Sequence, residues 1–241
     1  MYMIKTNLAV LMAERGLKIS DVYEATGISK TTLMAISDNT GKGIQYETMD
    51  KLCGFFNVTP DSFFVYSPYN FSFHIFDGED PFAGDALKNI AITVSRSSNL
   101  KSFTFSPDAV TPMGEFFDVT KKDADFIINY NFSINIVDEE EAKRSKRSKS
   151  EFYNIYDKLP TILKADLNKQ FLNLVLKNLS SLNGQTITVF DGKIDFNNTD
   201  EWTHDLTIKN NMKVIVNLFN GRFTRLVKIP LFITDSKNIN E

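Results

Sequence analysis

The sequence predicts a multi-domain chain: an all-α N-terminal domain of five short helices, then an α+β C-terminal domain with an antiparallel sheet and one long helix. Three observations predict this division. Short apolar repeats at helical spacing fill the first 66 residues, alternating apolar and polar residues come later, and only four of the 21 phenylalanines precede residue 67. Pro68 disfavours a continuing helix, so we place the domains at 1–67 and 68–241.

Composition excludes several classes of protein. The 241 residues are 42% hydrophobic and 24% charged, which is typical of globular chains. No apolar run approaches the roughly 20 residues of a membrane span, and the first residues do not read as a signal peptide, so we expect a cytoplasmic protein without membrane contact. A single cysteine, Cys53, excludes a disulfide framework. The net charge of −3 does not by itself indicate nucleic acid as a partner.

Five short helices account for the first domain. We expect them at residues 5–15, 21–26, 30–37, 47–56 and 60–64. Ser20 and Ser29 are the expected N-caps of the second and third helices, because a serine oxygen can accept from the free N–H groups of a first turn. Gly27 supplies the left-handed conformation that the turn between these helices needs.

The third helix has one face that packs and one that projects. The apolar residues expected to lock the second helix across the third are Val22, Ile28, Leu33 and Ile36. The residues left on the outward side are Lys30, Thr31, Thr32 and Ala35. Short polar and basic side chains at the start of such a helix fit the major groove of B-DNA.

This segment resembles a known family in the order and spacing of its helices. The matching residues are Leu8-x-x-Leu11-Met-Ala-Glu-Arg15, Leu17, Val22-x-Glu-Ala-Thr-Gly27-Ile28-Ser29-Lys-Thr-Thr-Leu33-x-x-Ile36 and Glu47-Thr48-x-x-Lys51-Leu52-x-x-Phe55-Phe56-Asn57-Val58-Thr59-Pro60-Asp61-x-Phe63. Over these residues the chain resembles the Cro/C1-type helix-turn-helix repressors of phages and related bacterial regulators. The resemblance implies that the chain binds double-stranded operator DNA.

The resemblance also implies roles for single residues. It implies base-facing roles for Lys30, Thr31, Thr32 and Ala35, and contacts with the DNA backbone for Ser20, Ser29, Asn39 and Lys42. Two positions depart from the family. Ile19 stands where the family usually has a glutamine that holds a phosphate, and Tyr23 stands where a small residue is common. The first departure removes one expected backbone contact, and the second changes the packing of helices two and three.

The charge of the first domain leaves an alternative open. Residues 1–66 hold six basic and seven acidic residues, a net charge of −1. Because phosphate contacts normally dominate affinity, a near-neutral domain must gather its positive charge on one face, and Lys18, Lys30 and Lys42 can do so. The alternative is a helical domain that binds protein rather than DNA.

The second domain shows patterns of strands and one helix. Residues 128–136 alternate strictly, Asn220-Gly221 predicts a hairpin between 212–219 and 222–233, and Asp191-Gly192 predicts another between 187–190 and 194–196. Residues 161–180 predict the long helix. The acidic block 138–141 and the basic block 143–149 predict a solvated loop, with a nucleic-acid contact as the less favoured interpretation.

The second domain shows no catalytic, cofactor or metal site that we can support. Ala83-Gly84 is similar to the dipeptide that self-cleaving repressors cut, but no serine–lysine pair accompanies it. Asp108, Asp191 and Lys193 are a faint match to a metal-dependent nuclease, although Asp191 is already explained as a turn residue. We interpret His74, His204 and Cys53 as structural.

These observations together predict a regulator that is not an enzyme. We expect a sequence-specific repressor of a phage or another mobile element, acting as a homodimer. Its second domain would mediate dimerisation and receive an inducing signal from an antirepressor protein or a ligand. The competing hypothesis is a DNA-targeted defence enzyme, such as a metal-dependent nuclease carried by the same helix-turn-helix domain.

Overall fold

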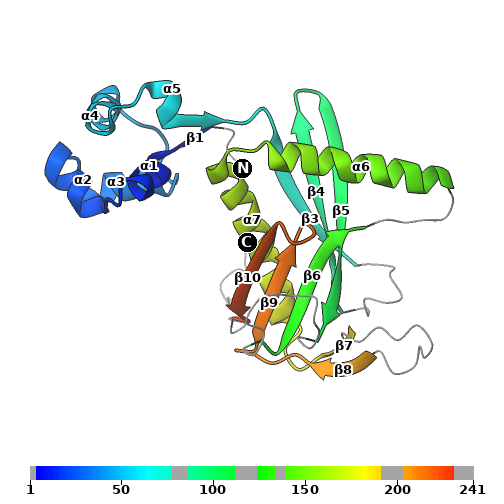
Figure 1. Ribbon diagram of the computed structural model, residues 1–241. Helices are drawn as coiled ribbons and strands as arrows, with labels where there is room; N and C mark the ends of the chain where they lie inside the picture. The colour runs from blue at the N-terminus through cyan, green and yellow to red at the C-terminus, as the bar shows by residue number, and fades with distance from the viewer. Residues whose placement is uncertain (1–3, 78–85, 112–123, 134–138, 191–202, 231–241) are drawn as a thin grey trace, which may run out of the picture. The chain divides into compact units, whose positions relative to one another are not determined.

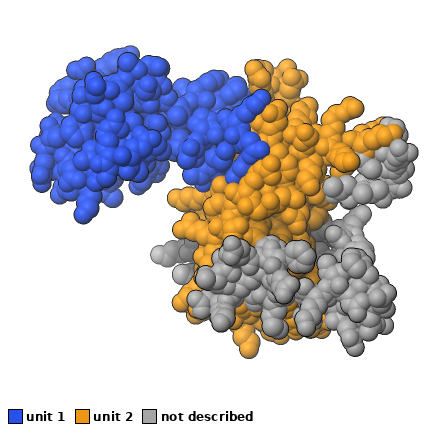
Figure 2. All heavy atoms as spheres, viewed as in Figure 1, with its two compact units in different colours: residues 1–70, 156–166 blue, residues 71–155, 167–241 orange. Residues whose placement is uncertain are grey.

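The computed structural model describes residues 4–77, 86–111, 124–133, 139–190 and 203–230. These residues form two compact units (Figure 2). Unit 1 comprises residues 1–70 with 156–166, and unit 2 comprises 71–155 with 167–241. No helix in the described parts of the chain is both long enough and apolar enough to cross a membrane.

Unit 1 contains the five predicted helices (Figure 1). They are α1 (Leu8–Glu14), α2 (Ile19–Thr26), α3 (Lys30–Ser37), α4 (Tyr46–Phe56) and α5 (Pro60–Phe63). Each contributes to one buried core: Leu8, Leu11, Met12, Val22, Ile28, Leu33, Ile36, Leu52, Phe56 and Phe63. The helices are short, so their stability comes from burying these apolar faces rather than from intrinsic propensity.

The prediction of an all-α first domain is wrong in one respect. β1 (Ile4–Thr6) pairs antiparallel with β2 (Phe64–Tyr66), and α1 therefore begins at Leu8 rather than at residue 5. Lys5, expected in the first helix, lies buried in β1, and its Nζ is 2.9 Å from a carboxylate oxygen of Asp166. β1 forms because a partner strand 60 residues away satisfies its backbone groups, which periodicity within one segment does not reveal.

Unit 2 is built on a curled sheet (Figure 1). Its strands are β3 (Asn70–Phe76), β4 (Asn89–Arg96), β5 (Asn99–Val110), β6 (Phe126–Phe132), β7 (Thr186–Phe190), β8 (Thr203–Thr207), β9 (Lys213–Leu218) and β10 (Phe223–Lys228). The main path runs β10-β9-β6-β5-β4-β3, and β7 joins β5 to β8.

The sheet is mixed, and this observation corrects the prediction of an antiparallel sheet. β5 pairs antiparallel with β4 and with β6, but β6 pairs with β9 in parallel and β5 pairs with β7 in parallel. Long connections allow strands to run in the same direction, and the described residues of the connection between β6 and β9 form two helices and two strands. Alternation in a strand does not specify its partner.

Two long helices, rather than one, belong to this part of the chain. α7 (Thr161–Ser181) confirms the predicted helix at 161–180, but α6 (Glu139–Asp157) replaces most of the predicted charged loop. Acidic residues in the first turn suit a helix, because the helix dipole favours negative charge there. Burial of Phe152 and Tyr153 in the following turns gives α6 an apolar anchor.

Aromatic side chains fill the core of unit 2 and explain the phenylalanine count. The ring of Phe105 on β5 lies 4.9 Å from that of Phe152 on α6, 5.7 Å from that of Phe171 on α7 and 5.1 Å from that of Phe219. These edge-to-face contacts show that α6 and α7 cover one face of the sheet. Tyr130 of β6 is also fully buried, and burial raises the pKa of its hydroxyl.

The strand and hairpin predictions have different outcomes. The alternating strand is confirmed as β6, although residues 134–136 of the prediction lie outside the described residues. The Asn220-Gly221 hairpin is confirmed between β9 and β10, with φ of +55° and +79° at those two residues. Asp191-Gly192 and residues 194–196 lie outside the described residues, and β7 pairs antiparallel with β8.

Candidate DNA-binding interface

The turn between α2 and α3 follows the predicted geometry. α2 ends at Gly27, whose φ of +70° is left-handed and whose N–H donates to the carbonyl of Tyr23 at 2.8 Å. The four expected locking residues, Val22, Ile28, Leu33 and Ile36, are all buried. α3 is therefore held on α2 by its apolar face, and its other face is exposed.

The start of α3 is fixed by the expected cap. The Oγ of Ser29 accepts the N–H of Thr32 at 3.1 Å and lies 2.8 Å from the Thr32 hydroxyl. Ser29 thus satisfies a first-turn donor, and the Thr32 hydroxyl is held within the cap. Thr31 and Lys30 are exposed beside it, whereas Ala35 one turn later is half-buried.

The exposed surface of α2, α3 and α4 includes side chains for which the sequence does not predict a contact, namely Tyr23, Met34 and Tyr46. Lys30 Nζ lies 5.3 Å from the centre of the Tyr23 ring, so the tyrosine holds the ammonium group by a cation–π contact rather than packing between the helices. Met34 is 54% exposed and Tyr46 at the start of α4 is 96% exposed. The signal in the sequence that could have indicated Met34 and Tyr46 is a large apolar residue in or near the recognition helix, at a position that the core does not need.

The prediction that Ser20 caps α2 is wrong. α2 begins at Ile19 with Lys18 at its N-cap, so Ser20 lies within the first turn. The Asp21 carboxylate accepts the Lys18 N–H at 2.7 Å, and the Ser20 hydroxyl donates to the same carboxylate at 3.2 Å. Because the aspartate reaches back three residues, it satisfies the N-cap N–H and starts the helix earlier than a serine cap would.

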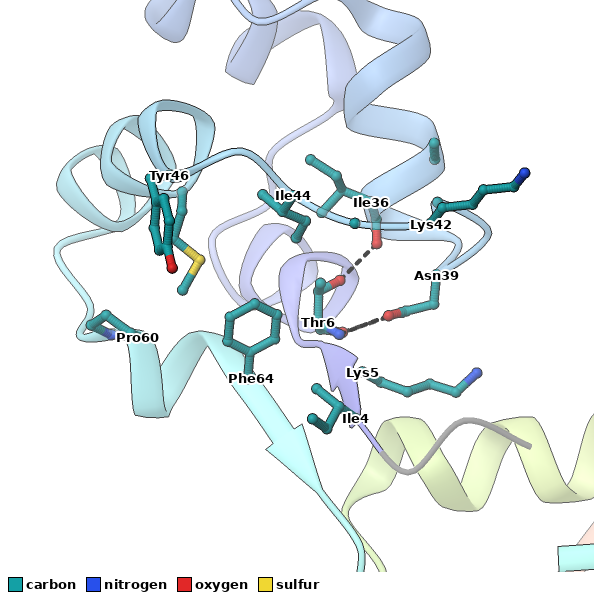
Figure 3. A pocket seen from close by; sticks show the side chains of 14 residues that line it. Ile4, Lys5, Thr6, Ile36, Asn39, Lys42, Ile44, Tyr46, Pro60 and Phe64 are labelled. Atoms are coloured by element: carbon teal, nitrogen blue, oxygen red, sulfur yellow. Dashed lines mark hydrogen bonds between the residues drawn. The ribbon is translucent and has the colours of Figure 1, made fainter. Parts of the chain in front are cut away.

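Hydrogen bonds between Asn39, Ile36 and Thr6 hold the end of α3 to β1, and we call this set of bonds the clasp. The Asn39 Oδ1 accepts the Thr6 N–H at 2.7 Å, and the Asn39 Nδ2 donates to the Thr6 carbonyl at 3.3 Å (Figure 3). The buried Thr6 hydroxyl donates to the Ile36 carbonyl at 2.6 Å. Asn39, for which a DNA-backbone contact is expected, therefore also has an internal role, and its φ of +56° suits an asparagine.

A hollow of about 620 Å³ lies between β1, the end of α3 and the start of α4. Ile44, Met49 and Phe64 give it an apolar lining, and the Lys42 side chain extends outward at its rim (Figure 3). Ala35 also lines it, so the hollow adjoins the exposed face of α3. Lys42 is exposed, as a contact with the DNA backbone requires.

Internal contacts occupy half of the basic side chains in residues 1–66. Lys5 pairs with Asp166, and Lys51 pairs with Glu47 at 2.8 Å, where the hydrogen bond and charge of Lys51 lower the pKa of the glutamate. Arg15 donates to the Phe56 carbonyl at 3.0 Å.

Within residues 4–66, which the structure describes in full, the cations left without an ion pair are Lys18, Lys30 and Lys42. All three are exposed. They are the three side chains that the sequence nominates for attracting phosphate.

Among the candidate catalytic residues, Asp108 is described, and it makes structural contacts in unit 2. The two carboxylate oxygens of Asp108 accept from the side-chain amides of Asn129 at 2.7 Å and Asn131 at 2.9 Å. The described residues contain no group of three or more metal-ligand side chains. Asp191, Lys193 and the dipeptide Ala83-Gly84 lie outside the described residues.

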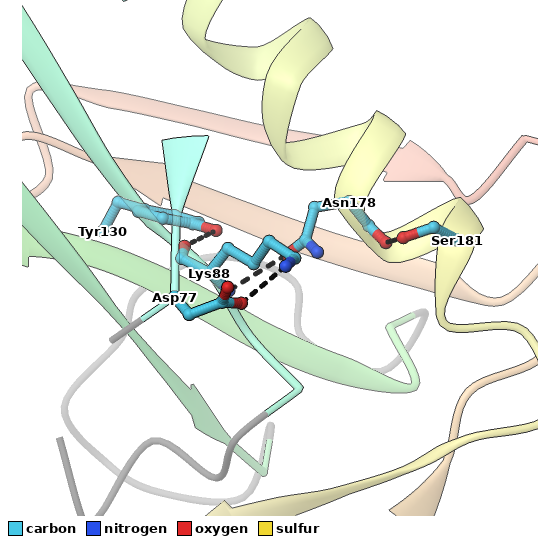
Figure 4. Close-up of polar contacts among 5 residues, drawn as sticks. All are labelled: Asp77, Lys88, Tyr130, Asn178 and Ser181. Atoms are coloured by element: carbon cyan, nitrogen blue, oxygen red, sulfur yellow. Dashed lines mark hydrogen bonds and ion pairs between the residues drawn. The ribbon is translucent and has the colours of Figure 1, made fainter. Parts of the chain in front are cut away.

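Three other titratable side chains of unit 2, those of Lys88, Tyr130 and His74, also have local contacts. Lys88 Nζ is 2.5 Å from an Asp77 carboxylate oxygen, and this hydrogen bond and the lysine charge lower the pKa of Asp77 (Figure 4). The Tyr130 hydroxyl donates to the Lys88 carbonyl and the Lys88 N–H donates to Asn178 Oδ1, so this cluster links β3, β4, β6 and α7. His74 stacks on Phe76, with ring centres 5.8 Å apart.

Comparison with known proteins identifies the helical region. Residues 7–68 match the family model of the Cro/C1-type HTH DNA-binding domain. This match confirms the resemblance seen in the sequence and spans all five helices of unit 1. Searches of curated proteins and of solved structures found no match for the chain. The chain therefore carries an N-terminal DNA-binding domain of the kind found in regulators, followed by a sheet-rich region.

Proposed function

We propose that this protein is a sequence-specific transcriptional repressor of a phage or another mobile element, and that it acts in the cytoplasm without catalysing a reaction. In this proposal residues 1–67 read operator DNA. Lys30, Thr31, Thr32 and Ala35 face the bases, with Thr32 also serving the cap. Ser20, Ser29, Asn39 and Lys42 contact the backbone.

One observation carries the proposal. The match to the family model spans the whole helix-turn-helix, and α3 exposes Lys30 and Thr31 in its first turn. Ser29 caps this turn, and the buried side chain of Leu33 packs α3 on the core. A rigid helix with short polar and basic side chains at its N-terminal end is what major-groove recognition requires. Lysine can bind guanine or phosphate, and threonine can bind either base edges or phosphates.

The second part of the proposal concerns residues 68–241. One recognition helix reads few base pairs, so we propose that this region forms a homodimer that places two such helices on half-sites about 10 base pairs apart. We propose also that it receives induction from an antirepressor protein or a ligand. The support is indirect: its described residues form a packed aromatic core, and Asp108, the acid expected in a nuclease, is bound by two asparagine amides.

The test is selection of binding sites from random double-stranded DNA, followed by gel shift on the selected site. We expect a two-fold symmetric site and a dimer in sedimentation. Lys30→Ala and Thr31→Ala should each lower the preference for the selected site by about 1–3 kcal/mol per lost base contact. Lys51→Ala, which removes an exposed lysine paired with Glu47, is the matched control and should retain the preference. Failure to enrich any sequence would reject the proposal.

A further inference from the structure

α6 carries the densest basic segment of the chain. Residues 143–149 contain five cations: Lys143, Arg144, Lys146, Arg147 and Lys149. The structure places this segment within a helix, so the cations are displayed over two turns of a rigid element. Three acidic residues precede them in the first turn, at 139–141, and the cations outnumber these acids.

Four of these five cations are exposed, and Lys149 is half-buried. Arg144, Lys146 and Arg147 are exposed and form no ion pair with any other described side chain. The acid that follows on the helix, Glu151, is paired with Lys101 of β5, so its charge is already compensated. α6 is held on the sheet by Phe152, whose ring packs on that of Phe105.

We propose that the exposed basic segment of α6, through Arg144, Lys146 and Arg147, binds the phosphate backbone of double-stranded DNA without regard to base sequence. This inference rests on the proposed function, because DNA is the polyanion that the helix-turn-helix brings to the chain. The helix-turn-helix domain has a net charge of −1, and its exposed cations without an ion pair among the described residues are Lys18, Lys30 and Lys42. Since phosphate contacts dominate affinity, α6 supplies positive charge that the reading domain lacks.

The apolar residues of α6 favour DNA over a lipid surface. A helix that lies on a membrane buries an apolar face in the lipid, beside its cationic face. The aromatic residues of α6, Phe152, Tyr153 and Tyr156, are all buried in the protein, and its other large apolar residue, Ile155, is half-buried. The exposed cations therefore have no exposed aromatic side chain of α6 beside them, and they can bind a phosphate group by charge alone. Such a contact is independent of the base sequence.

The experiment measures binding of the full chain to a fluorescent random-sequence duplex by anisotropy, over a series of salt concentrations. The test variant is Arg144→Gln with Lys146→Gln and Arg147→Gln. The control variant is Lys169→Gln with Lys177→Gln and Lys209→Gln, which removes the same charge from exposed positions elsewhere in unit 2. Each lost phosphate contact lowers the slope of log K against log salt by about 0.9, so we expect a decrease of about 2–3 in the test variant and none in the control.

Further variants separate the possible outcomes. Arg144→Lys with Arg147→Lys keeps the charge and should keep the wild-type slope, and circular dichroism checks that each variant is folded. A test variant with the slope of the control overturns the inference, even if the selected operator is still recognised. Loss of binding to phosphatidylserine vesicles with unchanged DNA binding also overturns it, in favour of a membrane contact. Lys30→Ala should lose operator preference while keeping the α6 contribution, so failure of the proposed function is recognised separately.

Discussion

Substitution of Asn39 tests whether the clasp between α3 and β1 positions the recognition helix. Asn39→Ala removes two hydrogen bonds to Thr6, of 2.7 and 3.3 Å, which are worth about 1 kcal/mol each. Alanine at a φ of +56° adds about 1 kcal/mol of backbone strain, for a total of about 3 kcal/mol. Asn39→Gly loses the same bonds without the strain, so it should cost about 1 kcal/mol less.

The assay is hydrogen exchange of the amides of β1 and α3 in the full chain. A loss of about 3 kcal/mol corresponds to protection lowered by up to about 150-fold in Asn39→Ala, and Asn39→Gly should lie between that variant and the wild type. Equal exchange in all three proteins would refute the reasoning. So would unchanged exchange accompanied by a large loss of operator affinity, because Asn39 would then act as a contact with the DNA backbone, the role that its family resemblance implies.

Three further predictions concern the same unit. Ser29→Ala should lower the stability of α3 by about 1 kcal/mol through loss of its cap, seen as faster exchange at Thr32, and unchanged exchange would contradict it. Leu33→Ala, at a fully buried position, should lower the free energy of unfolding by about 3–5 kcal/mol in urea titration, and a cost below 1 kcal/mol would count against the packing described. Burial, and then the charge of Asp50, raise the pKa of the Cys53 thiol, so alkylation at neutral pH should be slower than for a free cysteine and should accelerate as pH rises. Asp50→Asn should move that pH–rate midpoint down, and an upward movement would be inconsistent with the assigned cause.

Much of unit 1 could be predicted because its signals are local. Gly27 and Ser29 act within one turn of the chain, and the apolar spacing from Val22 to Ile36 records which face of each helix is buried. The matched family model confirms the domain that these signals indicate. Ser20 shows the limit of such local signals. The carboxylate of Asp21 accepts the N–H of Lys18, so α2 begins before Ser20 and Ser20 is not its cap.

What the sequence could not predict depends on contacts between distant residues. The clasp joins Thr6 to Asn39, and the parallel pair of β6 and β9 joins strands separated by two helices. α6 is a helix where adjacent blocks of opposite charge predict a loop, and the packing of Phe152 on the ring of Phe105 anchors this helix to the sheet.

The sequence by itself therefore determined the helix-turn-helix, its cap and the exposed start of α3, since these follow from hydrogen bonds and apolar spacing within a few turns. Only the tertiary structure decided the mixed sheet, the β1–β2 pair and the basic helix α6. These features are stabilised by burial and by strand pairing between distant segments, so no single segment of the chain specifies them in isolation.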